Sequence, residues 1–236
     1  MKNPSADLFL LPSPLAESPI EHSIPAGTFQ SVRHIRHFIC ETPKSARRYL
    51  KELGLELSLQ ELRFHPLNKH TDDQDVPALL SPCLEGEDTA LLSDAGSPGI
   101  ADPGARLVRY AHQRGVRVRP LVGPSSPFLA LMGSGLNGQQ FRFHGYAPLD
   151  PQDLKKRIGR MNEDALQGES QLIMETPYRN DRLLDALLKN GNADLNLCIA
   201  LELGGEEELV RTLPVPEWEK ERPTLHKRPA IFILGK

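Results

Sequence analysis

The sequence predicts an α/β protein of two domains, each built on a roughly five-stranded mixed sheet flanked by helices. Three observations lead to this prediction. Short apolar segments typical of buried strands alternate with helical segments along the whole chain. Five strand segments precede a Gly-Pro step at residues 123–124, and five follow it. Because two sheets of ordinary width fit this number better than one sheet of ten strands, we expect domains over residues 1–121 and 124–236.

In the first half, near-continuous apolar strands indicate a largely parallel sheet. The expected strands cover residues 8–11, 37–40, 62–65, 89–92 and 116–121. The expected helices cover residues 26–34, 43–53, 75–84 and 105–114. The second helix is well delimited, with Thr42 as N-cap, Pro43 at its first position and Gly54 at its end. Gly115 ends the fourth in the same way.

The alternation resumes after the Gly-Pro step. The expected elements are a helix in 125–136, a strand in 140–148, a helix in 150–166, a strand at 171–175, a helix at 181–190, and strands at 195–203, 208–215 and 229–234. Asp150 is the expected N-cap of the helix that follows it.

Composition narrows the class of protein. Hydrophobic residues make up 39% of the chain and charged residues 25%, as in a soluble globular protein. No apolar run approaches the roughly 20 residues of a membrane span, and the amino end lacks signal-peptide features. Cys40, Cys83 and Cys198 are too widely spaced for a disulfide framework or a CxxC metal site. We therefore expect a cytoplasmic protein without membrane contact or a metal site.

Charge alone does not indicate a nucleic-acid-binding protein, because the net charge is −3. Eight Lys, Arg and His residues nevertheless lie between Arg33 and Lys51. This cluster is typical of a solvated helix face, and a local basic patch is the alternative interpretation.

The stretch LLSDAGSPGIADPG, residues 91–104, predicts a small-molecule site. It follows the fourth strand, at the carboxyl edge where open α/β sheets bind ligands. Gly96 and Gly99 let the backbone approach a ligand, while Asp94 and Asp102 are typical turn-forming residues. A simple chain reversal does not need a loop of this length.

Four further segments are expected at strand ends. PSPLAES (12–18) lacks the glycines of a dinucleotide-binding or common Rossmann-type methyltransferase turn. VGPSSPF (122–128) offers Ser125 or Ser126 as a helix cap beside a ligand. FICETPKS (38–45) and METPYRN (174–180) end strands with Glu41 and Glu175, which could accept a proton, hold a ribose hydroxyl or be ordinary strand-end carboxylates.

Together these segments, in order over essentially the whole chain, resemble the tetrapyrrole methylase superfamily of S-adenosylmethionine-dependent methyltransferases. The carrying motifs are SDAGSPGIADPG, the proline-rich first turn, ETPK in place of the family's EDTR, and Gly123-Pro124 in place of its PGP hinge. The most similar branch methylates the ribose 2′-oxygen of a cytidine in bacterial small-subunit ribosomal RNA.

The resemblance implies a homodimer with S-adenosyl-L-methionine in a cleft between the two domains, and ribosomal RNA or the small ribosomal subunit as partner. It assigns cofactor binding to Pro12, Gly96, Ser97, Pro98, Ile100, Ala101, Ser125, Ser126, Met174, Ala200, Leu201, Pro229 and Ala230.

For methyl transfer to a ribose hydroxyl, the candidate bases are Glu41 and Glu175. The candidate phosphate contacts are Lys44, Arg47, Arg48 and Arg179. Two alternatives stay open. The acceptor could be a tetrapyrrole or another small molecule, which a deep apolar cleft would favour. The chain could also bind S-adenosylmethionine without catalysis, since LAESPIE replaces the family's IGNLGD after the first turn.

Overall fold

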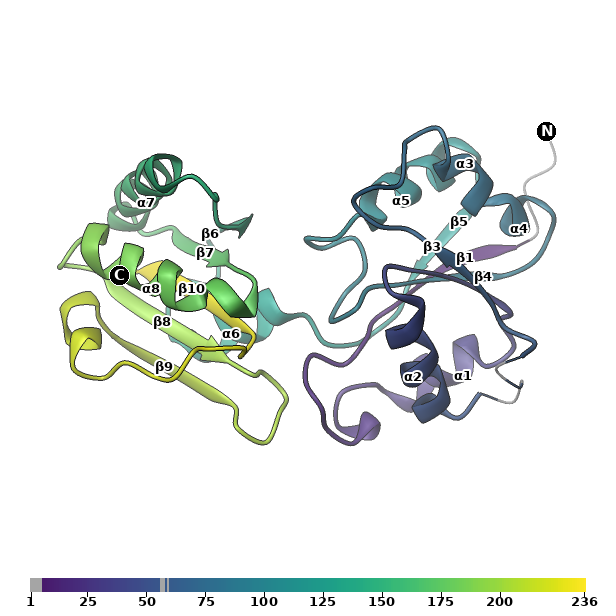
Figure 1. The fold of residues 1–236 in the computed structure, drawn as a ribbon, viewed down its shortest axis with the longest axis horizontal. Helices are drawn as coiled ribbons and strands as arrows, with labels where there is room; N and C mark the ends of the chain where they lie inside the picture. The colour runs from purple at the N-terminus through teal and green to yellow at the C-terminus, as the bar shows by residue number, and fades with distance from the viewer. Residues whose placement is uncertain (1–5, 56–57, 59) are drawn as a thin grey trace. The chain divides into compact units, whose positions relative to one another are not determined.

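The chain divides into two units, Met1–Ser125 and Ser126–Lys236, each with one five-stranded sheet (Figure 1). The computed structural model describes residues 6–55, 58 and 60–236. Two α/β units with flanking helices confirm the predicted fold class. The domain ranges 1–121 and 124–236 stay a prediction from the sequence.

The sheet of the first unit is parallel throughout, in the order β3-β2-β4-β1-β5. Its strands are β1 (Asp7–Leu11), β2 (His37–Cys40), β3 (Arg63–Pro66), β4 (Thr89–Leu92) and β5 (Arg117–Pro120). The helices are η1 (Ile20–His22), α1 (Ala26–Val32), α2 (Pro43–Leu53), α3 (Val76–Leu79), α4 (Ser81–Leu84) and α5 (Gly104–Gln113). Because all five strands run the same way, the loops that follow them lie at one edge.

Helices cover both faces of this sheet, so the side chains of its three central strands, β1, β2 and β4, alternate between two cores. Phe9, Phe38 and Ala90 pack on the side of α1 and α2. Leu8 and Leu91 pack on the other side, with α3, α4 and α5. Burial on both faces explains why the central strands β1, β2 and β4 are mostly apolar, whereas the edge strands β3 (RFHP) and β5 (RVRP) are more polar and more exposed.

One predicted helix is wrong in its extent. Residues 75–84 form two short helices, α3 and α4, which meet at Leu80. Proline has no N–H, so Pro82 cannot donate to the carbonyl of Ala78 and one continuous helix is interrupted there. The predicted helix end at Gly54 is confirmed, with φ +70°.

The second unit has a mixed sheet in the order β6-β7-β10-β8-β9, in which only β6 and β7 are parallel neighbours. Its strands are β6 (Phe141–Tyr146), β7 (Ser170–Met174), β8 (Asn196–Leu201), β9 (Leu209–Pro214) and β10 (Ala230–Gly235). Its helices are α6 (Ser126–Ser134), α7 (Pro151–Leu166), η2 (Pro177–Arg179), α8 (Asn180–Asn190) and η3 (Val215–Glu219).

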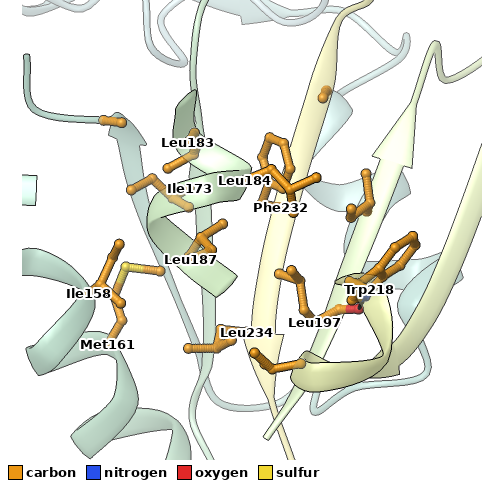
Figure 2. Close-up of a cluster of buried hydrophobic side chains, with 14 of the residues drawn as sticks. Ile158, Met161, Ile173, Leu183, Leu184, Leu187, Leu197, Trp218, Phe232 and Leu234 are labelled. Atoms are coloured by element: carbon orange, nitrogen blue, oxygen red, sulfur yellow. Dashed lines mark hydrogen bonds between the residues drawn. The ribbon is translucent and has the colours of Figure 1, made fainter. Parts of the chain in front are cut away.

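The core of this unit lies between the sheet and α7, α8 and η3 (Figure 2). Trp218 is fully buried there, and its indole N–H donates to the carbonyl of Leu197 at 2.8 Å. The predicted cap of α7 is confirmed, because the Asp150 carboxylate accepts from the backbone N–H groups of Gln152 and Asp153.

Among the described residues, no helix combines the length and apolar character that a membrane crossing requires.

Candidate functional site: four loops at one sheet edge

The long loop after β4 is held in shape by its own backbone and one carboxylate. Gly96 and Gly99 have φ +73° and +84°, which glycine adopts without steric cost. Asp102 Oδ1 accepts from the N–H groups of Gly99 (2.8 Å) and Gly104 (2.7 Å), so its predicted turn-forming role is confirmed. Burial raises the pKa of Asp102, and these two donors oppose the rise. Ala101 has φ +59°, a costly conformation for a residue with a side chain.

The proline-rich turn after β1 is bonded to this loop. Ser13 and Gly96 exchange two backbone hydrogen bonds of 2.9 Å each, forming an isolated antiparallel bridge. The hydroxyl of Ser13 donates to the Ser93 carbonyl at 2.8 Å, and that of Ser93 donates to the Gly96 carbonyl at 2.9 Å. These hydrogen bonds therefore link the two loops into one network.

The loop after β5 is part of the same hydrogen-bonded network. Ser97 Oγ donates to the carbonyl of Pro124 at 3.1 Å. A Cβ on Gly123 would lie 2.5 Å from Pro12 Cβ, so only glycine allows this approach of the two backbones. These contacts bring the backbone segments around Pro12, Gly96 and Ser97 close together. The other predicted cofactor contacts in this unit, Pro98, Ile100, Ala101 and Ser125, follow in the same loops.

The loop after β2 is tied in through a side chain. Thr42 occupies the N-cap position of α2, but its side chain makes no capping bond. Its hydroxyl donates instead to Asp94 Oδ2 at 2.6 Å. The predicted cap is therefore wrong in its bonding, because the tertiary partner replaces the local one.

Glu41, beside Thr42, is half-buried and faces other carboxylates. Burial raises the pKa of Glu41, and the negative charges of Asp94 and Asp102 raise it further, against the opposing charge of Lys69. Glu41 shares a narrow crevice with Ser93 and Asp102. A carboxylate with a raised pKa is a stronger base than an ordinary one.

A cavity of about 520 Å³ lies beside the first turn. It is lined by residues 13–18, by Ser45, Ala46, Arg48, Tyr49 and Glu52 of α2, and by residues 93–95. Arg48 is the one predicted site residue among them. Sequence reasoning missed Tyr49, whose hydroxyl donates to the Pro12 carbonyl at 2.7 Å. The signal was available as the helical spacing of Ser45, Arg48, Tyr49 and Glu52.

The predicted phosphate contacts in this unit have different surroundings. Arg47 lies over the ring of Phe64, with its guanidinium carbon 4.6 Å from the ring centre. Arg48 pairs with Glu17 at 3.3 Å, and both side chains are exposed. Lys44 is exposed at the start of α2.

In the second unit, strand register brings four predicted residues to one end of the sheet. Met174 on β7 and Ala200 on β8 both pair with Ile231 of β10. Ala230 pairs with Leu201. The carbonyl of Pro229 accepts from the N–H of Glu202 at 3.0 Å. Ser126 is the first residue of α6.

Glu175 and Arg179 form an ion pair in the same unit. Glu175 Oε1 accepts from Arg179 Nη2 and from the Thr176 N–H, each at 2.7 Å. Burial acts to raise the pKa of Glu175, but these bonds outweigh it and hold the pKa below its ordinary value. Both charges are therefore engaged in an ion pair.

Metal ligation has no geometric support in the part of the chain that the structure describes, where no group of three or more His, Cys, Asp or Glu could hold an ion. Cys40, Cys83 and Cys198 are buried and free.

The fold is similar to the crystal structure of the methyltransferase CobJ, with TM-score 0.65 and 14% identity over 98% of this chain and 95% of that one. It is also similar to the crystal structure of uroporphyrin-III-C-methyltransferase from Thermus thermophilus, with TM-score 0.61 and 17% identity over 98% and 94% of the two chains.

Sequence comparison gives the family. Residues 28–218 match the tetrapyrrole (corrin/porphyrin) methylases, and the chain belongs to that family. It is 34% identical to ribosomal RNA small subunit methyltransferase I of Vibrio cholerae, over 71% of this chain and 58% of that one. It is 31% identical to the protein of that name from Halalkalibacterium halodurans, over 82% and 66%. The chain thus spans less than two thirds of the length of these relatives.

Proposed function

We propose that this protein is an S-adenosyl-L-methionine-dependent methyltransferase that methylates a ribose 2′-oxygen in small-subunit ribosomal RNA. The observation that carries the proposal is the loop after β4, whose backbone is held by the Asp102 carboxylate. This loop is also hydrogen-bonded to the turns after β1 and β5. Membership of the methylase family and the names of the relatives support the same activity.

The loop fits a cofactor held by backbone groups. A Cβ placed on Gly99 would meet nothing within 4 Å, so open space lies beside the backbone there. Ile100 is 46% exposed although it is a large apolar residue, and its neighbour Ala101 is held in the left-handed region. Strained backbone and exposed apolar side chains concentrate at ligand sites. In this proposal Pro12, Gly96, Ser97 and Pro98 also contact the cofactor.

The remaining predicted cofactor contacts belong to the same proposal. They are Ser125, Ser126, Met174, Ala200, Leu201, Pro229 and Ala230.

S-adenosylmethionine supplies a methyl group bonded to a positively charged sulfur. Transfer of this methyl group to the acceptor oxygen would leave neutral S-adenosylhomocysteine and would require loss of the proton from the acceptor hydroxyl. The hydroxyl proton goes to a base, for which Glu41 is the first candidate because burial and the nearby carboxylates raise its pKa. Glu175 is the second candidate, although its carboxylate is already engaged by Arg179.

The acceptor in this proposal is a polar molecule. The cavity beside the first turn is lined by Glu17, Arg48, Glu52 and Asp94 together with serines. A tetrapyrrole would be favoured by a deep apolar cleft, whereas this cavity mixes charged and polar side chains with apolar ones such as Pro14 and Leu15. Lys44, Arg47, Arg48 and Arg179 remain the proposed phosphate contacts. We also propose that the protein is a homodimer and that it acts in the cytoplasm.

Calorimetric titration with S-adenosylmethionine and S-adenosylhomocysteine tests cofactor binding. We expect micromolar affinity for the native protein and its loss in Ser97→Trp, because the indole would fill the space beside the loop. Gln113→Trp, at the exposed end of α5, is the matched control and should bind normally. Absence of binding to the native protein would contradict the proposal.

Transfer of a radiolabelled methyl group to small ribosomal subunits or their RNA, followed by nucleoside analysis, tests the acceptor. We expect 2′-O-methylcytidine, and a strong loss of turnover in Glu41→Gln with unchanged cofactor affinity. Unchanged turnover would remove Glu41 from the mechanism. Tight cofactor binding with no transfer to any ribosomal substrate would favour a binding protein without catalysis.

A further inference from the structure

A second cavity, also about 520 Å³, lies in the second unit between β6 and α7. It is lined by Arg142 and His144 of β6 and by Arg157, Arg160, Glu163 and Asp164 of α7. None of these residues belongs to the loops described above.

The periodicity of the two elements explains why these side chains meet. Leu154, Ile158 and Met161 form the buried face of α7, and Figure 2 shows the last two packed in the core. Arg157 and Arg160 follow the same helical spacing on an adjacent stripe. Arg142 and His144 are two residues apart on a strand and so share one face of the sheet.

A chain of hydrogen bonds positions Arg157. Gln171 is fully buried, and its Nε2 donates to Glu169 Oε2 at 2.8 Å. Its Oε1 therefore accepts from His144 Nε2 at 2.7 Å. His144 Nδ1 is then free to accept from Arg157 Nη1 at 3.3 Å. Burial lowers the pKa of His144 and keeps the ring in this neutral form, the only one that can accept the arginine bond.

The charges in the cavity are unequally compensated. Arg142 is paired with Asp164 at 3.0 Å and with Glu169 at 3.7 Å. Arg157 instead bonds to a neutral imidazole. Arg160 has no hydrogen-bond or ion-pair partner among the described residues. Even with Glu163 included, the six lining residues carry net positive charge.

We propose that this cavity binds a backbone phosphate of the RNA substrate through Arg157 and Arg160. The inference rests on the proposed function, since it assumes an RNA acceptor. A guanidinium matches phosphate oxygens with two parallel hydrogen bonds. Because Arg157 is already held by His144 and Gln171, less side-chain entropy is lost when the phosphate binds. The site gives RNA a contact in the second unit, outside the cofactor loops.

The test compares two double variants with equal loss of charge on the same helix. Arg157→Gln/Arg160→Gln removes the cavity pair, and Lys155→Gln/Lys156→Gln removes two exposed charges that do not line the cavity. Binding of a labelled small-subunit RNA fragment is measured by fluorescence anisotropy over a range of salt concentrations. We expect the first pair to weaken binding about ten-fold or more and to reduce the salt slope by about 1–2, against roughly three-fold or less for the lysine pair.

Each other outcome has a defined meaning. Equal weakening by the two pairs would overturn the inference while leaving the proposed function standing, whereas failure of the native protein to bind RNA would contradict both. Binding of inorganic phosphate that is lost in the arginine pair, with RNA affinity unchanged in the same variant, would assign the cavity to free phosphate and overturn the RNA contact. Arg160→Gln alone, which breaks no bond among the described residues, repeats the test if the double variant does not fold. Calorimetry with S-adenosylmethionine should give native affinity in every variant.

Discussion

Tyr49 connects the second helix to the first turn through a single hydroxyl. The hydroxyl is buried and donates to the Pro12 carbonyl at 2.7 Å, and burial raises the pKa of this tyrosine well above its ordinary value. The bond holds the first turn against α2, at the wall of the cavity in the first unit. A position that a sequence pattern alone would assign to the core therefore also shapes the candidate site.

Replacing Tyr49 by Phe should destabilise the protein by about 1–2 kcal/mol, because the buried Pro12 carbonyl loses its partner. Urea unfolding measures the change. Tyr110→Phe is the control, since that ring lies beneath the Arg114 guanidinium, and this contact does not need the hydroxyl. Equal effects of the two substitutions would show that the Tyr49–Pro12 bond contributes nothing.

Glu175 should make stability depend on pH. Its folded pKa is lowered, so its contribution is complete above the ordinary glutamate value of about 4.3 and disappears as pH falls through the lower folded value. Glu175→Gln should therefore melt a few degrees lower than the native protein at neutral pH, with the difference vanishing in acid. Asp194→Asn, at an exposed position, should show no such trend. A difference that is independent of pH would contradict the ion-pair account.

At the scale of elements, the loops at the parallel edge depend on close approach of backbones. Gly123→Ala would place a methyl group 2.5 Å from Pro12 Cβ, and neither ring nor backbone can move away easily. We expect a loss of about 1–3 kcal/mol, as for other overpacked sites, together with weaker S-adenosylmethionine binding. Gly138→Ala, where the new Cβ meets nothing within 4 Å, is the control. Denaturant unfolding and calorimetry measure the two effects, and normal behaviour of Gly123→Ala would show that the loops tolerate separation.

At the scale of the whole molecule, the second unit has a core of its own. Trp218 is the one tryptophan in the chain, and it is fully buried in that core (Figure 2). Its fluorescence therefore reports on this unit alone.

A fragment of residues 126–236 should fold independently. We expect blue-shifted tryptophan emission in buffer and a single cooperative transition in urea. Red-shifted emission without denaturant would show that the core of the second unit needs the rest of the chain.

The sequence by itself determined the elements whose causes are local. The expected bounds of β2, α2 and β4 agree with the structure, because apolar runs and flanking Pro or Gly residues delimit them. The division into two sheets followed from the same kind of pattern, whereas ligand binding by the loop after β4 stays a prediction. The roles of Glu41, Glu175 and the proposed cofactor contacts stay predictions.

Only the tertiary structure decided which side chains meet. Thr42 and Asp94 are 52 residues apart in sequence, Ser13 and Ser93 are 80 apart, and Tyr49 and Pro12 are 37 apart. Local patterns carry no information about such pairs, because the order of strands in the sheet brings them together. That same order made Thr42 a partner of Asp94 instead of a helix cap, and the pairing of β6 with β7 placed His144 beside Gln171.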